Sequence, residues 1–217
     1  MNLLIAAATD KELEAVKRYF NGYNSNTVIL TVTGVGSIAT CFALTEAIST
    51  QSPDMVIQIG IGGSFSDELA IGSAVVVKSE VIADMGVIET DGYKNIFELG
   101  LTSGNTFPYK EEALINGNSE LIQMTGMKAV VGITANEITT QPEKISLFKD
   151  RYGAEIESME GAALHYVCIS KKIPFIQIRG ISNLIGERNK SKWKINEAID
   201  SSSNACIALV DKLTTTV

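Results

Sequence analysis

Short apolar runs alternate with amphipathic segments along most of the chain. Continuous apolar runs, typical of strands buried on both faces, predict strands at residues 3–8, 27–33, 55–59, 128–133 and 173–181. Apolar residues at helical spacing predict helices at residues 10–20, 37–49, 142–152, 159–170 and 193–213. This order predicts an α/β fold with a three-layer α/β/α arrangement around a mostly parallel, mixed central sheet. Without a recognisable linker or repeat, residues 1–217 are expected to form a single domain.

The middle of the chain departs from this alternation. Residues 73–79 and 81–85 predict adjoining strands with no room for a helix between them. The sheet is therefore expected either to extend here or to curl toward a barrel. A Gly-rich turn is expected at residues 60–64, a long loop at 93–109 and a short strand at 155–157.

Composition narrows the range of partners. The 217 residues are 45% hydrophobic and carry a net charge of −7, so a basic face for nucleic acid is not expected. One histidine and three scattered cysteines, Cys41, Cys168 and Cys206, predict buried free thiols rather than a disulfide or a metal site. The start lacks a basic segment and no apolar run reaches transmembrane length, so we expect a cytoplasmic protein without a membrane partner.

Polar or Gly-rich segments follow several predicted strands, at the places where open α/β sheets bind ligands. These segments are residues 9–12, 34–37, 60–64, 134–137, 157–160 and 179–183. The carboxyl ends of parallel strands meet at one edge of a sheet, so these segments are expected to converge in space. The sequence therefore predicts one ligand site built from distant parts of the chain.

Two Gly-rich segments offer backbone that can approach a ligand closely. Residues 34–39 match a dinucleotide-binding fingerprint, but Gln58 stands where that site requires an acidic residue. A tight turn that approaches a ligand is the better interpretation. Residues 60–64 lack the Gly-Lys-Ser/Thr ending of a P-loop, which leaves Gly62 and Gly63 as candidates for substrate contact or as parts of a plain turn.

Two carboxylates lie where predicted helices begin, and each also has a purely structural interpretation. Glu12 completes a Thr-x-x-Glu capping box with Thr9, so capping and chemistry are equally supported. Glu160 lies in the predicted first turn of its helix, where the helix dipole favours an anion. Its small apolar neighbours also suit a carboxylate that accepts hydrogen bonds from two sugar hydroxyls. His165, within the same helix, is interpreted as a packed side chain.

Four segments give the chain a resemblance to a known family. They are Glu12, the run at residues 60–64, Ser-Met-Glu-Gly-Ala at 158–162, and Arg-Gly-Ile-Ser-Asn at 179–183. With these residues the chain resembles the purine nucleoside phosphorylase/nucleosidase superfamily over nearly its whole length. Within that superfamily it looks most similar to the futalosine hydrolases.

The resemblance implies a role for each matching residue in the hydrolysis of an N-glycosidic bond. Glu12 matches the residue that positions and deprotonates water, and Arg179 is expected to orient that water or Glu12. Glu160 matches the carboxylate that binds the ribose hydroxyls, with Met159 packed against the sugar. Asn183 is expected to contact the departing purine. The remaining candidates for substrate binding are Gly62, Gly63, Ile138 and Ser182.

Departures from the family pattern refine the expected substrate and nucleophile. Asn183 stands where adenine-specific nucleosidases have Asp, and its amide can donate to a 6-oxo group while accepting from N7–H. No arginine neighbours the glycine turns in the sequence, which favours water over phosphate. Ile61 replaces a small hydroxyl residue. Ile138 replaces an aromatic over the purine, so Phe65 or an aromatic within residues 107–109 is expected to stack on the base instead.

The resemblance thus implies a futalosine hydrolase that releases hypoxanthine and dehypoxanthine futalosine in menaquinone biosynthesis. It implies a small-molecule purine nucleoside substrate, no metal or cofactor, and a homo-oligomer that is a dimer or larger. The alternatives are a methylthioadenosine/S-adenosylhomocysteine nucleosidase, an aminofutalosine nucleosidase, a phosphorylase and a non-catalytic nucleoside-binding protein.

Overall fold

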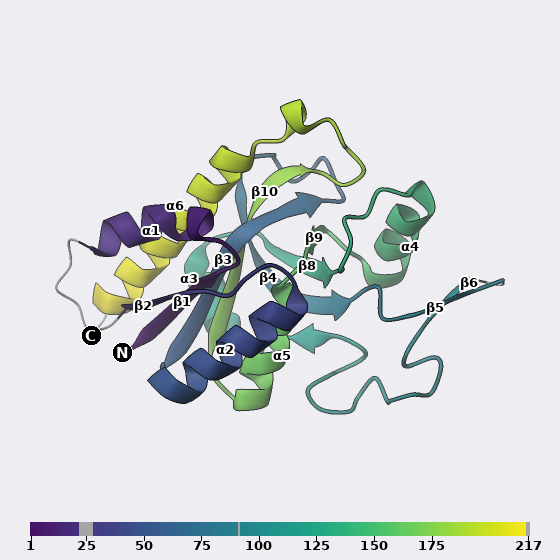
Figure 1. The fold of residues 1–217 in the computed structure, drawn as a ribbon, viewed down its shortest axis with the longest axis horizontal. Coiled ribbons are helices and arrows are strands. Elements are labelled where there is room, and N and C mark those ends of the chain that lie inside the picture. The colour runs from purple at the N-terminus through teal and green to yellow at the C-terminus, as the bar shows by residue number, and fades with distance from the viewer. Residues whose placement is uncertain (22–27, 91, 216–217) are drawn as a thin grey trace.

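The computed structural model describes residues 1–21, 28–90 and 92–215, in which strands and helices alternate as the apolar pattern predicts (Figure 1). The first half contains β1 (Leu3–Ala7), α1 (Asp10–Phe20), β2 (Val28–Val32), α2 (Ser37–Gln51), β3 (Met55–Ser64), β4 (Ala74–Ile82), β5 (Gly86–Glu89) and β6 (Gly92–Asn95). The second half contains β7 (Leu114–Ile115), α3 (Ser119–Thr125), β8 (Ala129–Thr134), α4 (Pro142–Tyr152), β9 (Ile156–Ser158), α5 (Gly161–Lys171), β10 (Phe175–Leu184), a 3₁₀ helix (Lys190–Lys192) and α6 (Ile195–Thr215).

The central sheet is mixed, mostly parallel and partly closed. Strand β1 pairs in parallel with β2 and β3, and β3 pairs in parallel with β10. Antiparallel pairing of β10 with β4 is followed by parallel pairs β4–β8 and β8–β9, and β9 returns antiparallel to β3. The pairings β3–β10–β4–β8–β9–β3 therefore close a ring, so the sheet curls into a barrel at this end.

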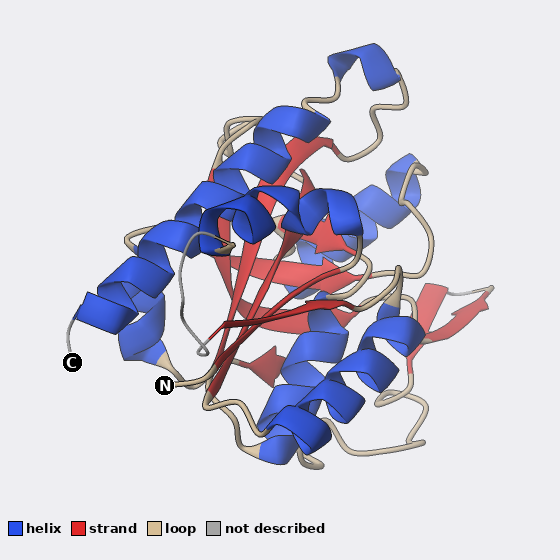
Figure 2. Ribbon diagram, turned by 60° about the vertical axis from the view of Figure 1, so that its left-hand side comes forward, coloured by secondary structure: helices blue, strands red, loops and turns tan. Residues whose placement is uncertain are grey.

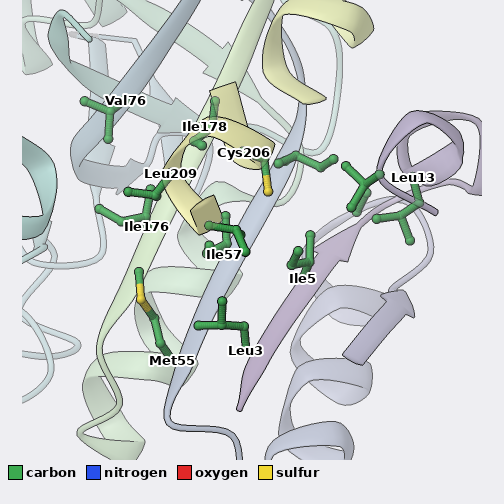
Figure 3. Close-up of a cluster of buried hydrophobic side chains, with 14 residues drawn as sticks. Leu3, Ile5, Leu13, Met55, Ile57, Val76, Ile176, Ile178, Cys206 and Leu209 are labelled. Atoms are coloured by element: carbon green, nitrogen blue, oxygen red, sulfur yellow. The ribbon is translucent and has the colours of Figure 1, made fainter. Parts of the chain in front are cut away.

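Alternate residues of β1 face two separate layers of helices, as expected for a strand buried on both faces. Leu3 and Ile5 belong to a core cluster with residues of α1 and α6, whereas Leu4 belongs to a cluster with residues of α2 and α5. Figure 2 shows helices on both sides of the strands, and Figure 3 shows Cys206 of α6 close to the sheet residues of the first cluster. The predicted three-layer α/β/α class is confirmed.

Strands β3 and β10 extend further than the sequence predicts. They pair in parallel as far as Ser64 and Leu184, so the predicted turn at residues 60–64 is wrong: that segment is the second half of β3. A Cβ atom at Gly62 would lie 2.9 Å from the Glu157 backbone oxygen. Glycine therefore permits the close crossing of β9 rather than a change of chain direction.

The middle of the chain also differs from prediction. The two strands expected at residues 73–79 and 81–85 are one continuous strand, β4, whose register against β8 shifts between Val77 and Ser79. The loop expected at 93–109 begins within a hairpin of β5 and β6, which projects from the sheet in Figure 1. The short elements β7 and α3 were not predicted, because neither has enough apolar residues for a clear period. Residue 27, expected in the second strand, lies outside the described residues.

Three expectations from composition can be compared with the described residues. Cys168 and Cys206 are buried free thiols, while Cys41 is only half-buried. Among these residues, no helix is long and apolar enough to cross a membrane. Within the same ranges, no group of three or more His, Cys, Asp and Glu side chains is arranged to hold a metal ion.

Candidate active site

A cleft with a volume of about 250 Å³ opens at the carboxyl ends of the central strands. It is lined by Ala8, Thr9, Glu12, Val35, Ile61, Gly62, Gly63, Ile138, Glu157, Ser158, Met159, Glu160, Ser182, Asn183, Ile185 and Trp193. Of the residues predicted from the sequence to act in catalysis or to bind the substrate, Arg179 and the expected stacking aromatics do not line this cleft, and the others do. The predicted convergence of distant segments is therefore present, and it occurs at the edge where open α/β sheets bind ligands.

Glu12 caps α1, as its structural interpretation predicts, and it also lines the cleft. Its Oε2 accepts hydrogen bonds from Thr9 N at 3.0 Å and Thr9 Oγ1 at 2.8 Å, and Thr9 Oγ1 accepts from Glu12 N at 3.3 Å. Its other oxygen, Oε1, accepts from Ile61 N at 3.3 Å. The capping box fixes the carboxylate at the end of β1, where it faces the cleft.

Glu160 faces the cleft from the start of α5. It is the N-cap residue rather than a member of the predicted first turn, and its side chain makes no capping hydrogen bond. Instead, Oε1 accepts from Gly36 N at 2.9 Å, and Oε2 lies 3.6 Å from Arg179 Nη1. Gly36 has a φ of +89°, a conformation that glycine adopts without strain. The turn at residues 34–36 therefore binds a protein carboxylate.

Arg179 lies beneath the cleft and is 1% exposed. Its Nη2 donates to Gln58 Oε1 at 2.6 Å, and its ion pair is with Glu160 rather than with Glu12, its expected partner. A Cβ atom at Gly60 would collide with the guanidinium. No arginine neighbours Gly60 in the sequence, which suggested that none lies near this glycine. That expectation is wrong, because β10 places Arg179 beside Gly60 in the structure. The arginine nevertheless does not line the cleft.

Ser182 and Asn183 line the cleft from the end of β10, at a bulge in the pairing of this strand with β3. Ser182 Oγ lies 2.7 Å from Asn183 Oδ1, to which it can donate, and 3.2 Å from the carbonyl oxygen of Gly62. Asn183 Nδ2 donates to the Leu184 carbonyl at 2.8 Å. These contacts fix which end of the amide is oxygen and which is nitrogen. Each end keeps one further hydrogen-bonding position.

The apolar walls of the cleft differ partly from prediction. Met159 and Ile138 line it as expected, and Ile138 is 47% exposed. Phe65, a predicted stacking residue, packs in a core cluster and does not line the cleft. Among the described residues, Trp193 is the only aromatic residue that lines the cleft, and it was not predicted as a site residue. Its indole nitrogen donates to the Glu187 carbonyl at 2.9 Å, which holds the ring at the rim.

Glu157, like Trp193, lines the cleft although no role was predicted for it from the sequence. Its Oε1 accepts from Thr139 N at 3.0 Å, and burial raises the pKa of its carboxyl group. With Glu12 and Glu160 it brings the carboxylates lining the cleft to three, while the described lining contains no lysine or arginine. The cleft therefore presents negative charge and neutral hydrogen-bonding groups to a ligand.

Residues 4–215 match the sequence profile of the phosphorylase superfamily, which covers nearly the whole chain. The chain belongs to the phosphorylase superfamily. The fold is similar to that of the crystal structure of 5′-methylthioadenosine/S-adenosylhomocysteine nucleosidase from Helicobacter pylori. That structure superposes with a TM-score of 0.83 at 17% identity and covers 98% of both chains.

Two curated relatives are similar to the chain over most of its length. A futalosine hydrolase from Streptomyces coelicolor is 29% identical over 94% of this chain and 93% of its own length. A 5′-methylthioadenosine/S-adenosylhomocysteine nucleosidase from Pseudoalteromonas translucida is 28% identical over 87% of this chain and 81% of its own length. The chain is accordingly an N-glycosyl hydrolase of the nucleosidase type.

Proposed function

We propose that the protein hydrolyses the N-glycosidic bond of futalosine, releasing hypoxanthine and dehypoxanthine futalosine in menaquinone biosynthesis. The observation that carries the proposal is the cleft itself, which is lined by the carboxylates of Glu12 and Glu160 and by the amide of Asn183. The similarity to a futalosine hydrolase over nearly the whole chain supports it.

The carboxylate side of the cleft suits the sugar. Breaking the bond between C1′ and the purine nitrogen leaves positive charge on the ribose, which nearby carboxylates stabilise. Glu12 takes a proton from the attacking water, whose oxygen forms the new bond to C1′. Glu160 accepts hydrogen bonds from the ribose hydroxyls, and Met159 packs against the ring. Arg179 is a positioning residue, because its contact is with Glu160 and not with the cleft.

The amide side suits a 6-oxopurine. Asn183 has one free proton on Nδ2 and one free acceptor position on Oδ1 after its bonds to Leu184 and Ser182. A 6-oxo group accepts a hydrogen bond from the first. The departing base gains a proton on N7 from solvent water as its bond to C1′ breaks, and this N7–H donates a hydrogen bond to the second. An adenine presents a 6-amino donor where Nδ2 also donates. The pairing therefore favours hypoxanthine over adenine.

Water suits this cleft better than phosphate as the nucleophile. Three carboxylates line the described cleft and no cationic side chain does, so a phosphate dianion would meet repulsion without a partner. We therefore expect hydrolysis rather than phosphorolysis. A methylthioadenosine/S-adenosylhomocysteine nucleosidase is the nearest alternative, because relatives of that kind are almost equally similar.

Product analysis tests the reaction type. The protein is incubated with futalosine in phosphate-free buffer and in phosphate, and the base and sugar products are identified by mass spectrometry. We expect hypoxanthine and the free sugar at equal rates in both buffers. A phosphate requirement with a sugar 1-phosphate product would indicate a phosphorylase, whereas binding of futalosine without any cleavage would indicate a nucleoside-binding protein.

We also propose that the protein is a homo-oligomer, a dimer or larger. Supporting this, apolar side chains project from α2 beside the cleft residue Val35: Ile38 is 87% exposed and Phe42 is 70% exposed. Exposed apolar patches of this kind mark protein contacts. Light scattering on the purified protein should give at least twice the chain mass of 23.3 kDa, and a monomer would contradict the proposal.

A further inference from the structure

A carboxyl group outside the proposed chemistry lies beside the start of α5, the helix whose N-cap is the cleft residue Glu160. Glu80, on β4, is 0% exposed. Gln177 Nε2 donates to its Oε1 at 2.9 Å, and Thr134 Oγ1 donates to its Oε2 at 3.0 Å. Each carboxyl oxygen thus has a donor, as a buried acceptor requires. Neither Glu80 nor Thr134 lines the cleft.

Two glycines leave the space that this carboxyl group occupies. A Cβ atom at Gly132, on β8, would lie 2.6 Å from Glu80 Oε1. A Cβ atom at Gly161, the first residue of α5, would collide with the same oxygen. A side chain at either position would displace the carboxyl group. The backbone of β8 and the start of α5 are therefore shaped around Glu80.

Thr134 connects Glu80 to the helix that carries Glu160. Ala162 N, in the first turn of α5, donates to Thr134 Oγ1 at 2.8 Å. The Thr134 hydroxyl therefore accepts from the helix and donates its own proton to Glu80. The first amides of a helix need acceptors from outside the helical ladder, and the N-cap side chain usually supplies one. Here Ser158 Oγ accepts from Gly161 N at 3.3 Å and Thr134 Oγ1 accepts from Ala162 N, which leaves the Glu160 side chain uncommitted to capping.

We propose that Glu80 and Thr134 form a positioning pair for the ribose-binding carboxylate. Glu80 orients the Thr134 hydroxyl as the cap of α5, and this remote cap frees Glu160 to accept from Gly36 and to face the cleft. The inference rests on the proposed role of Glu160 in binding ribose.

The charges of Arg179 and Glu160 are close enough to Glu80 to change the pKa of its carboxyl group. The positive charge of Arg179 lowers the pKa of Glu80, the negative charge of Glu160 raises it, and burial, the largest effect, brings it to about 7. His165 of α5 is also fully buried, which lowers its pKa to about 4, so it is neutral around pH 7. Glu80 is thus the group beside the start of α5 that changes charge near neutral pH.

A double-mutant cycle tests whether Thr134 acts through Glu160. Thr134→Val removes the cap, and we expect kcat/KM for futalosine to fall about tenfold, as for the loss of one hydrogen bond to a buried group. Thr134→Ser keeps the hydroxyl and should stay within about twofold of the wild type. Glu160→Gln should lower kcat/KM about a hundredfold. The double variant Thr134→Val/Glu160→Gln should be no more than about twofold worse than Glu160→Gln alone, because Thr134 then has nothing to position.

The outcomes separate this inference from the proposed function. Multiplication of the two single effects in the double variant would overturn the positioning role, as would a Thr134→Val protein with unchanged kcat/KM. Glu80→Leu should reproduce the Thr134→Val pattern, and if it does not fold, the Thr134 variants decide alone. A wild type inactive on futalosine would refute the proposed substrate instead. The same cycle would then be measured with methylthioadenosine, on which the same non-additivity is expected.

Discussion

Two groups of cleft residues, the carboxylates proposed to bind the sugar and the polar groups proposed to bind the base, are held in different ways. On the proposed sugar side, the Glu12 carboxyl group accepts from the backbone amides of Thr9, at the start of α1, and Ile61, in β3, and that of Glu160 accepts from Gly36 in a glycine turn. On the base side, Ser182 and Asn183 are neutral groups held by the irregular end of a single strand. Charge suits the part of the substrate that becomes a cation, and a fixed amide suits a neutral base that must be identified by its hydrogen-bonding pattern.

This difference indicates which changes should alter catalysis and which should alter selectivity. A substitution on the sugar side should affect all nucleosides alike, because every substrate passes through the same ribosyl cation. A substitution on the base side should change the ratio between substrates, because the 6-oxo and 6-amino groups place donors and acceptors differently. Substitutions at Glu12 and Asn183 test that division.

The largest effect is expected for Glu12→Gln. The amide keeps the size of the side chain but cannot take a proton from water, so kcat should fall by about a thousandfold or more for every nucleoside that is cleaved. The Kd for futalosine, measured by calorimetry, should remain within about threefold, because the base side is untouched. Glu14→Gln is the matched control, since Glu14 is an exposed residue of the same helix. Near-normal turnover by Glu12→Gln would exclude Glu12 as the base.

A smaller effect, confined to selectivity, is expected for Asn183→Asp. The carboxylate accepts from a 6-amino group and no longer donates to a 6-oxo group, so the kcat/KM ratio of futalosine to methylthioadenosine should fall about ten- to a hundredfold. Asn183→Ala, which removes both interactions, should lower kcat/KM for the two substrates without reversing the ratio. Unchanged preference for hypoxanthine release by Asn183→Asp would contradict this account of base recognition.

Glu80→Gln should alter stability in a pH-dependent way. The pKa of Glu80 is raised from 4.5 to about 7 in the folded protein, so the folded state keeps a proton that the unfolded chain loses. This contribution to stability is present below pH 4.5 and is lost as the pH rises through about 7. Gln cannot ionise, so the free energy of unfolding of Glu80→Gln should gain about 3 kcal/mol on the wild type between pH 4.5 and 7.5.

His165 gives this measurement an internal check. The pKa of His165 is lowered by burial to about 4 in the folded protein, so stability from this group is lost as the pH falls from 6.5 toward 4. In the wild type the Glu80 and His165 slopes oppose each other over the shared range, whereas Glu80→Gln retains only the histidine slope. The free energy of unfolding of the two proteins, measured with urea at several pH values, would show both pH dependences. Parallel curves for the two proteins would contradict burial of an ionisable Glu80.

Much of the fold could be predicted because its signals are local. The apolar pattern gave the bounds of α1 and α4 as the structure has them, since a capping residue, Thr9, and a proline at Pro142 mark where these helices begin. The extent of β3 and β10 could not be predicted in the same way. Their glycine and polar ends indicate turns locally, and only their pairing with each other makes them strands.

The residues of the site also differ in whether a local sequence signal marks them. Residues predicted to follow strands, such as Glu12, Glu160 and Asn183, were correctly expected to converge, because polar groups at strand ends meet at one edge of a parallel sheet. Trp193 was missed because it was expected at the start of a helix, where an aromatic residue has no special meaning. Glu80 was missed because one carboxylate within a strand reads as solvent-facing, and only the closure of the barrel buries it.

The most direct test of the central claim is a competition between substrates in one vessel. Futalosine, aminofutalosine and methylthioadenosine are mixed at equal concentration with the wild-type protein, and the released hypoxanthine and adenine are followed by chromatography. The account predicts that hypoxanthine appears at least about tenfold faster than adenine, because Asn183 pairs with a 6-oxopurine. Adenine as the main product would contradict it.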